Sequence, residues 1–127
     1  KNGGFYDYDE NRNPTPSPVA AQVIADFAAF SGVSPAGPLT DEEIIDRLLY
    51  AVVNEGARVL EEGIAIRASD IDVACILGYN WPMFTGGPMF WADTVGLQKI
   101  IDGLRATGQE PAQMLLDKAA RGEKFTG

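Results

Sequence analysis

The sequence contains no histidine and only one cysteine, Cys75, among its 127 residues. Histidine is the commonest general acid or base near neutral pH and a frequent zinc ligand. Its absence excludes Ser-His-Asp and Cys-His catalysis and most mixed-ligand zinc sites. A single cysteine cannot form an internal disulfide, which fits a reducing compartment.

Positive charge is also scarce, since the sequence has 10 Lys and Arg against 18 Asp and Glu, which gives a net charge of −8. Binding to nucleic acid or anionic membrane relies on cations that neutralise phosphates, so neither is expected as a partner. No apolar run reaches the roughly 18 residues of a membrane span. The start of the chain lacks both Met and the apolar core of a signal peptide, so we expect a piece of a longer polypeptide.

The periodicity of the apolar residues is helical. It predicts helices over 17–31, 41–63, 69–78, 88–107 and 111–121, bounded by Ser, Thr, Pro and Gly signals. No segment alternates as a half-buried strand does. The fold class is therefore predicted as all-α with about five helices.

Proline and glycine divide the chain. Residues 1–16 are rich in both and are interpreted as an arm or linker from a preceding domain, whereas 17–127 are expected to form one helical domain.

The predicted helix 41–63 has the clearest signals. Thr40 and Glu43 match a capping box, in which the hydroxyl and the carboxylate each accept a hydrogen bond from a free amide. Tyr50, Asn54 and Glu55 are placed on its polar side. The apolar positions fall on about half of its circumference and are Ile45, Leu48, Leu49, Val52, Val53, Gly56, Val59, Leu60 and Ile64. Gly56 inside this stripe implies the close approach of a neighbouring helix.

The residues that could carry chemistry each have a structural alternative. Gly86 and Gly87 precede Pro88 at a helix start, where free amides would suit either an anion or, as we favour, a tight loop. Neither GxGxxG nor GxxxxGK[ST] occurs. Asp70 and Asp72 are interpreted as acids in a first helical turn rather than as metal ligands.

An aromatic group, Tyr79, Trp81, Phe84, Phe90 and Trp91, is expected to be core rather than an apolar ligand pocket. Cys75 is expected to pack as a small hydrophobe. For Asn54 and Glu55 the sequence leaves two roles open, a bond to a loop or contact with a partner.

Several motifs occur in a specific order. The run from Arg47 to Ala65 contains Asn54-Glu55 and Glu61-Glu62-Gly63, and it is followed by Asp70-Ile71-Asp72, Gly78-Tyr-Asn-Trp-Pro82 and Gly86-Gly87-Pro88-Met-Phe-Trp. This order resembles the C-terminal helical domain of 3-hydroxyacyl-CoA dehydrogenases, and above all its second copy in multifunctional β-oxidation enzymes. Gly4-Phe5-Tyr6-Asp7-Tyr8 resembles the segment that closes the first copy.

The resemblance implies a helical domain like the C-terminal domain of 6-phosphogluconate dehydrogenase. It also implies a parent enzyme that oxidises L-3-hydroxyacyl-CoA with NAD and, if multifunctional, hydrates enoyl-CoA as well. The hydride chemistry would belong to a preceding NAD-binding domain, so no catalytic, cofactor-binding or metal residue is expected here. Asp46-Arg47 stands where the first copy has an Asn-Arg pair near the active site. A carboxylate there would repel enolate charge, which argues against catalysis.

The resulting candidates for an interface or cleft are Asp46, Asn54, Glu55, Trp81, Gly86 and Gly87. The expected partners are the preceding NAD-binding and helical domains, a second copy in a homodimer, or acyl-CoA. The expected location is the bacterial cytoplasm. The alternative is a free-standing helical module, without enzymatic activity, that binds acyl-CoA or another protein.

Overall fold

The computed structural model describes residues 4–34 and 37–127. The chain divides into two compact units, an N-terminal unit of residues 1–39 and a helical unit of residues 40–127. This division differs from the predicted boundary at residue 17, and where the domain begins within a longer protein stays a prediction.

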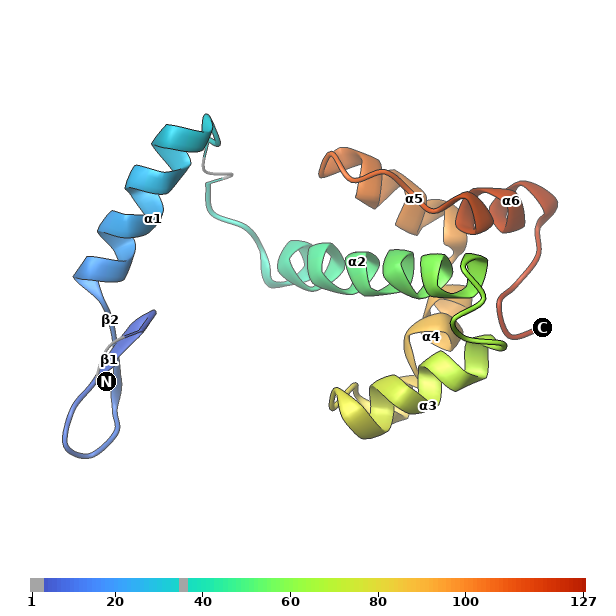
Figure 1. Ribbon diagram of the computed structural model, residues 1–127, viewed down its shortest axis with the longest axis horizontal. Helices are drawn as coiled ribbons and strands as arrows, with labels where there is room; N and C mark the ends of the chain where they lie inside the picture. Colours follow the sequence, from blue (N-terminus) through green and yellow to red (C-terminus); the bar gives the residue numbers. More distant parts are fainter. Residues whose placement is uncertain (1–3, 35–36) are drawn as a thin grey trace. The chain divides into compact units, whose positions relative to one another are not determined.

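The N-terminal unit opens with a hairpin that the sequence pattern did not predict. Strands β1 (Tyr6–Tyr8) and β2 (Pro14–Pro16) pair antiparallel, with Asp7 opposite Thr15 (Figure 1). The turn is organised by Asp9, whose carboxylate accepts hydrogen bonds from the Asn13 backbone and side-chain nitrogens, both at 2.8 Å. These bonds hold the pKa of Asp9 below its usual value. Turn chemistry rather than apolar alternation forms the hairpin, so the two strands have no periodic pattern in the sequence.

Helix α1 (Pro18–Ser31) begins and ends at the predicted signals. Pro18 occupies its first position and Gly32 ends it at φ +66°. No residue of α1 is buried in the described structure. Its large apolar side chains are exposed and include Val19, Val23, Ile24, Phe27 and Phe30.

The described residues of the helical unit form five further α-helices and one 3-10 turn. These are α2 (Asp41–Glu61), α3 (Ala68–Gly78), η1 (Met83–Thr85), α4 (Pro88–Val95), α5 (Leu97–Ala106) and α6 (Gln113–Arg121). Helix α2 runs through the middle and contacts all four others, with α5 and α6 above it and α3 and α4 below in Figure 1. The all-α class is confirmed.

Several helix bounds differ from the prediction by one or two residues, and one predicted helix is divided. Gly96 adopts φ +98° and divides the predicted helix 88–107 into α4 and α5. The apolar periodicity continues across this break, which hides it in the sequence. Helix α6 starts at Gln113 rather than at Pro111, because Ala112 is its N-cap and has a non-helical ψ of 145°. The Ala112 N–H donates to an α2 side chain.

The core of the helical unit lies between α2, α4, α5 and α6. Ile100, Leu104 and Leu115 are fully buried there, and Tyr50 and Trp91 pack with their ring centroids 6.0 Å apart. Burying one such aliphatic side chain stabilises the fold by about 1.5–3 kcal/mol.

The rotational setting of α2 was predicted wrongly. Tyr50 and Asn54, placed on the polar side, are buried, whereas Leu48 is 63% and Ile45 51% exposed. The reason is tertiary: Gly103 on α5 leaves room for the Tyr50 ring, which a Cβ there would strike. The helix therefore uses one side for its own core and leaves much of its apolar stripe uncovered.

Candidate functional site

An apolar groove of about 510 Å³ lies between α2 and α3 of the helical unit and is called here the α2–α3 groove. Glu55 is the one charged residue among those that line it. The lining residues are Leu48, Leu49, Val52, Glu55, Gly56, Val59, Ile71, Cys75, Tyr79 and Trp81.

Small and aromatic residues shape the groove. A Cβ on Gly56 would lie 2.6 Å from Met89 Sδ, so the glycine permits the predicted close approach of α4 to α2. Trp81 is buried and its Nε1 donates to Thr85 Oγ1 at 2.6 Å. Cys75 is half-buried, and burial raises the pKa of its thiol. The thiol is therefore neutral near pH 7 and acts as part of an apolar wall.

Of the predicted aromatic core, Trp81 and Trp91 are packed inward with centroids 6.0 Å apart. The prediction is wrong for the other three, since Tyr79 is 83%, Phe84 92% and Phe90 51% exposed.

Asp72 links α3 to the start of α4. Its carboxylate accepts hydrogen bonds from the backbone N–H groups of Met89 (2.7 Å) and Phe90 (3.3 Å). Gly87 has φ +102°, and a Cβ there would overlap Asp72. The amides that a bound anion would need are thus engaged by a carboxylate, and Gly86-Gly87 forms the tight loop that the sequence favoured.

The interpretation of Asp72 as a first-turn acid is wrong, because α3 has Asp70 as the acid of its first turn and Asp72 is buried. Burial raises the pKa of its carboxyl, and the two backbone donors partly oppose that shift. Asp70 does act as expected and pairs with Arg67 at 2.8 Å, which lowers the pKa of Asp70. Helix α3 begins at Ala68 with Arg67 as its N-cap, so Asp70 lies in the first turn and Asp72 lies beyond it.

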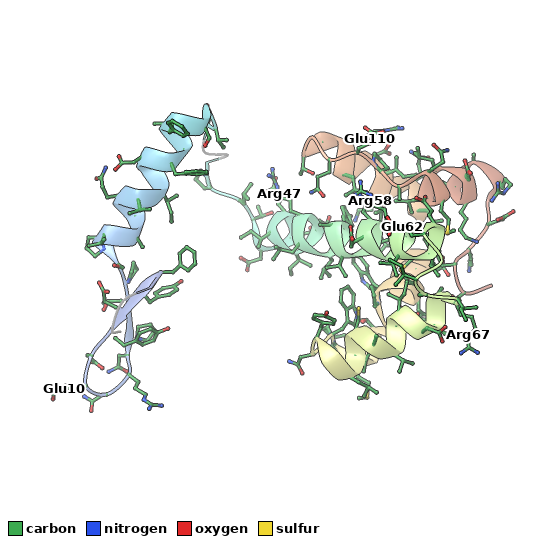
Figure 2. All side chains as sticks on the ribbon, in the orientation of Figure 1. Glu10, Arg47, Arg58, Glu62, Arg67 and Glu110 are labelled. Carbon is green, nitrogen blue, oxygen red and sulfur yellow. The ribbon has the colours of Figure 1, made fainter. Side chains whose placement is uncertain are left out.

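Asn54 holds the segment before α6. Its Nδ2 donates to the Glu110 carbonyl at 2.9 Å, and its Oδ1 accepts from the Ala112 N–H at 2.7 Å. Arg58 Nη2 donates to the same Glu110 carbonyl at 2.8 Å, and Figure 2 labels Arg58 and Glu110 on the side of α2 that faces α5 and α6. Of the two roles left open, Asn54 takes the bond to a loop, while Glu55 is exposed at the groove and 3.7 Å from Arg58.

Asp46 lies on the α5 side of α2, with its Oδ2 3.9 Å from Lys99 Nζ. Burial and the neighbouring Asp46 carboxylate raise the pKa of Tyr50 to about 12.

The candidate residues named from the sequence do not lie together in one site. Asp46 and Asn54 face α5 and the segment before α6, Glu55 and Trp81 line the groove, and Gly86 and Gly87 precede α4.

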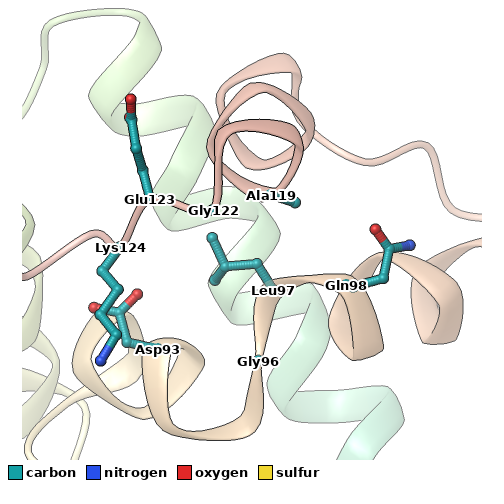
Figure 3. Close-up of a pocket in the computed structure, with 8 residues that line it drawn as sticks. All are labelled: Asp93, Gly96, Leu97, Gln98, Ala119, Gly122, Glu123 and Lys124. Carbon is teal, nitrogen blue, oxygen red and sulfur yellow. The ribbon is translucent and has the colours of Figure 1, made fainter.

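A second pocket, of about 270 Å³, lies where α4 meets α5 near the end of α6, with Leu97 at its centre in Figure 3. Its Asp93 carboxylate accepts from the Phe125 N–H at 2.8 Å, the Thr126 N–H at 2.9 Å and Thr126 Oγ1 at 2.7 Å. Asp93 thus fastens the end of the chain, and its oxygens are not available to a ligand.

Residues 4–34 and 37–127 contain no group of three or more Cys, Asp or Glu side chains placed to hold a metal ion. Over the same residues, no helix is both long enough and apolar enough to cross a membrane.

The comparisons with known proteins agree with this architecture. Residues 44–125 match the family described as 3-hydroxyacyl-CoA dehydrogenase, C-terminal domain. The chain belongs to this family. The match to this 3-hydroxyacyl-CoA dehydrogenase C-terminal domain begins within the first turn of α2 and continues past the end of α6.

Similar proteins are multifunctional enzymes. The domain is 37% identical over 128 residues to the peroxisomal fatty acid beta-oxidation multifunctional protein of Arabidopsis thaliana, a match that covers 94% of this chain and 18% of that protein. It is 36% identical over 129 residues to the peroxisomal bifunctional enzyme of Danio rerio, with the same coverage. The chain thus spans less than a fifth of these relatives.

The expected location is corrected by the same relatives. A protein of the bacterial cytoplasm was predicted, but the similar enzymes are peroxisomal or, in Cucumis sativus, glyoxysomal. The prediction rested on the lack of a targeting signal within these residues, which span only 18% of the relatives' length.

Proposed function

We propose that this chain is the accessory helical domain of a multifunctional, NAD-dependent L-3-hydroxyacyl-CoA dehydrogenase of fatty-acid β-oxidation. Its role is to pack against a neighbouring helical domain of the same enzyme and to hold that domain over the NAD-binding domain. The parent would also hydrate enoyl-CoA. The family and the names of the relatives support this assignment.

The observation that carries the packing role is the uncovered apolar stripe of α2. Ile45, Leu48 and Val52 are 51%, 63% and 38% exposed although their helix is the centre of the fold. Leu48 and Val52 line the α2–α3 groove of about 510 Å³, whose lining contains one charged residue. Apolar surface of this kind gains about 25 cal/mol per Å² when it is covered, so it favours a helix from another domain.

The hydride chemistry is assigned to another part of the parent. NAD binding requires a glycine-rich turn between a strand and a helix, and no GxGxxG sequence occurs in these 127 residues. NAD would bind the preceding domain, and the contribution of this domain would be structural.

Acyl-CoA is a weaker occupant of the groove than a helix is. The coenzyme carries several phosphate charges, whereas the groove offers Glu55 and no cation. A free-standing binding module is not favoured either, because the relatives contain this region as a small part of a larger protein.

The test is to replace Leu48 by Asp in the full-length enzyme, with Ile66→Asp as the matched control. Ile66 is 90% exposed and lies outside the groove. A carboxylate buried without a partner is strongly unfavourable, so Leu48→Asp should lower the melting temperature and reduce kcat of the dehydrogenase several-fold. Ile66→Asp should leave both unchanged.

Calorimetric titration of the 127-residue chain with acetoacetyl-CoA completes the experiment. We expect no saturable heat. Saturable binding, or a Leu48→Asp enzyme that matches the wild type in stability and rate, would contradict the packing role.

A further inference from the structure

A second surface of the helical unit is distinguished by its lack of charge. Residues 73–92 contain no Asp, Glu, Lys or Arg, although 22% of the chain is charged. This segment, called here the uncharged segment, runs from the middle of α3 through η1 into α4.

The uncharged segment turns large apolar side chains toward solvent. The exposed members are Val73 (54%), Leu77 (77%), Tyr79 (83%), Met83 (71%), Phe84 (92%) and Phe90 (51%).

Most of this surface is separate from the α2–α3 groove. Val73 and Leu77 are one turn apart on α3, whereas Ile71 and Cys75, two residues before each, line the groove. Residues two apart point to nearly opposite sides of a helix. Val73 and Leu77 therefore form a second face of α3.

The 3-10 turn and α4 extend the exposed surface. The Phe90 ring lies against the turn that follows η1, since a Cβ on Gly86 would be 2.6 Å from Phe90 Cδ1. Met83 and Phe84 belong to η1 itself. The most exposed ring of the set, that of Phe84, therefore lies at a turn fixed by Gly86 at φ +80°.

The exposed area is large for a free monomer. With about 200 Å² for each aromatic side chain, Phe84 and Phe90 alone expose about 290 Å² outside the groove. The largest apolar patch on a typical monomer is about 300–600 Å², and one side of a stable interface is about 800 Å². The aliphatic residues bring this surface close to the size of an interface. Depletion of charge and enrichment in Phe, Tyr, Trp and Met mark the centre of such interfaces.

We propose that the uncharged segment is covered in the full-length enzyme by an apolar, uncharged face of another domain of the same polypeptide. This rests on the proposed function in so far as it treats the chain as one domain of a larger enzyme. The similar proteins support it, because this chain matches 18% of their length and more than four-fifths lies in other parts.

A second copy is the less favoured occupant. Two copies each carry a net charge of −8 and repel one another. Their association also loses translational and rotational freedom, whereas a linked domain is present at an effective concentration in the millimolar range.

The test is hydroxyl-radical footprinting, read by mass spectrometry, of the full-length enzyme and of the 127-residue chain. Met83 and Phe84 should be oxidised at least fivefold more slowly in the full-length enzyme.

Phe84→Asp should lower the melting temperature of the full-length enzyme by several degrees and restore oxidation at Met83. Ile66→Asp is the matched control, with 90% exposure against 92% for Phe84, and should do neither. In the 127-residue chain neither variant should change stability by more than about 0.5 kcal/mol.

Equal oxidation of Met83 and Phe84 in the two proteins would overturn the inference. Protection in the 127-residue chain that disappears on dilution would also overturn it and identify a second copy as the occupant. The two proposals fail separately. If Met83 is protected but Leu48→Asp leaves stability and rate unchanged, only the packing role of the α2–α3 groove is contradicted. If Leu48→Asp lowers stability and rate but Met83 is not protected, only the present inference is contradicted.

Discussion

The two units of the chain use apolar residues in opposite ways. Helix α1 is almost entirely Ala, Val, Ile and Phe, and none of its residues is buried in the described structure. Helix α2 contains eight charged residues among its 21, yet it buries Tyr50, Val53, Asn54, Gly56 and Ala57. Apolar content therefore does not decide what becomes core. What decides it is whether neighbouring helices supply a complementary surface, as α5 and α6 do for α2.

The strongest test of this contrast compares Leu104→Ala in α5 with Phe30→Ala in α1. Leu104 is fully buried, so its truncation leaves a cavity and should lower the free energy of unfolding by about 3 kcal/mol. Phe30 is 89% exposed, and its truncation should change that free energy by less than about 0.5 kcal/mol. Urea unfolding of the 127-residue chain, followed by circular dichroism, measures both.

Equal losses in the two variants would break the contrast and would show that Phe30 is covered in solution. If instead Phe30→Ala leaves the stability of this chain unchanged and lowers that of the full-length enzyme, the exposed apolar side chains of α1 are covered by another part of that enzyme.

A polar pair gives a finer test. Asn54 and Asn13 each bond through their side chains, but Asn54 is 3% exposed and Asn13 is exposed. Asn54→Ala leaves the buried Ala112 N–H without a partner and should lower the free energy of unfolding by about 2 kcal/mol. Asn13→Ala removes one exposed side-chain bond, to Asp9 Oδ2, and should change the free energy of unfolding by about 0.5 kcal/mol or less.

The same urea titrations serve for this pair. Asn54→Asp is the informative companion, because it retains an acceptor for Ala112 but sets a charge against the Glu110 carbonyl. It should not rescue stability. Asn54→Ala as mild as Asn13→Ala would mean that water replaces the lost bonds and that the segment before α6 is held by other contacts.

Local signals made much of this fold predictable. The Thr40–Glu43 capping box is formed, with the Glu43 N–H 3.2 Å from Thr40 Oγ1 and the Thr40 N–H 2.8 Å from Glu43 Oε2. Pro18 and Gly32 bound α1 as expected. These features depend on residues three or four apart, whose geometry any helix fixes.

Features set by distant residues were not predictable. The burial of Tyr50 depends on Gly103, and the role of Asp72 depends on Gly87 and the start of α4. Neither pairing leaves a periodic trace in the sequence. For the candidate site, the family resemblance was confirmed while the individual residues separated into different places. Motif order reflects the fold as a whole, whereas exposure reflects how helices are rotated against one another.

Alkaline pH provides the subtlest comparison, because Tyr50 is buried in the helical unit while Tyr6 and Tyr8 are 48% and 59% exposed in the hairpin. The pKa of Tyr50 is raised from 10.0 to about 12 by burial and by Asp46. Between pH 10 and 12 the unfolded chain loses this proton while the folded chain keeps it. The free energy of unfolding must therefore decrease as the pH rises through that interval, by about 2 kcal/mol.

Tyr50→Phe removes this loss. In urea titrations the stability difference between wild type and variant should be constant below pH 9, and by pH 11.5 it should have changed in favour of the variant. Parallel curves would show that the Tyr50 hydroxyl ionises as readily in the folded chain as in the unfolded one, and that water reaches it through the α2–α5 contact.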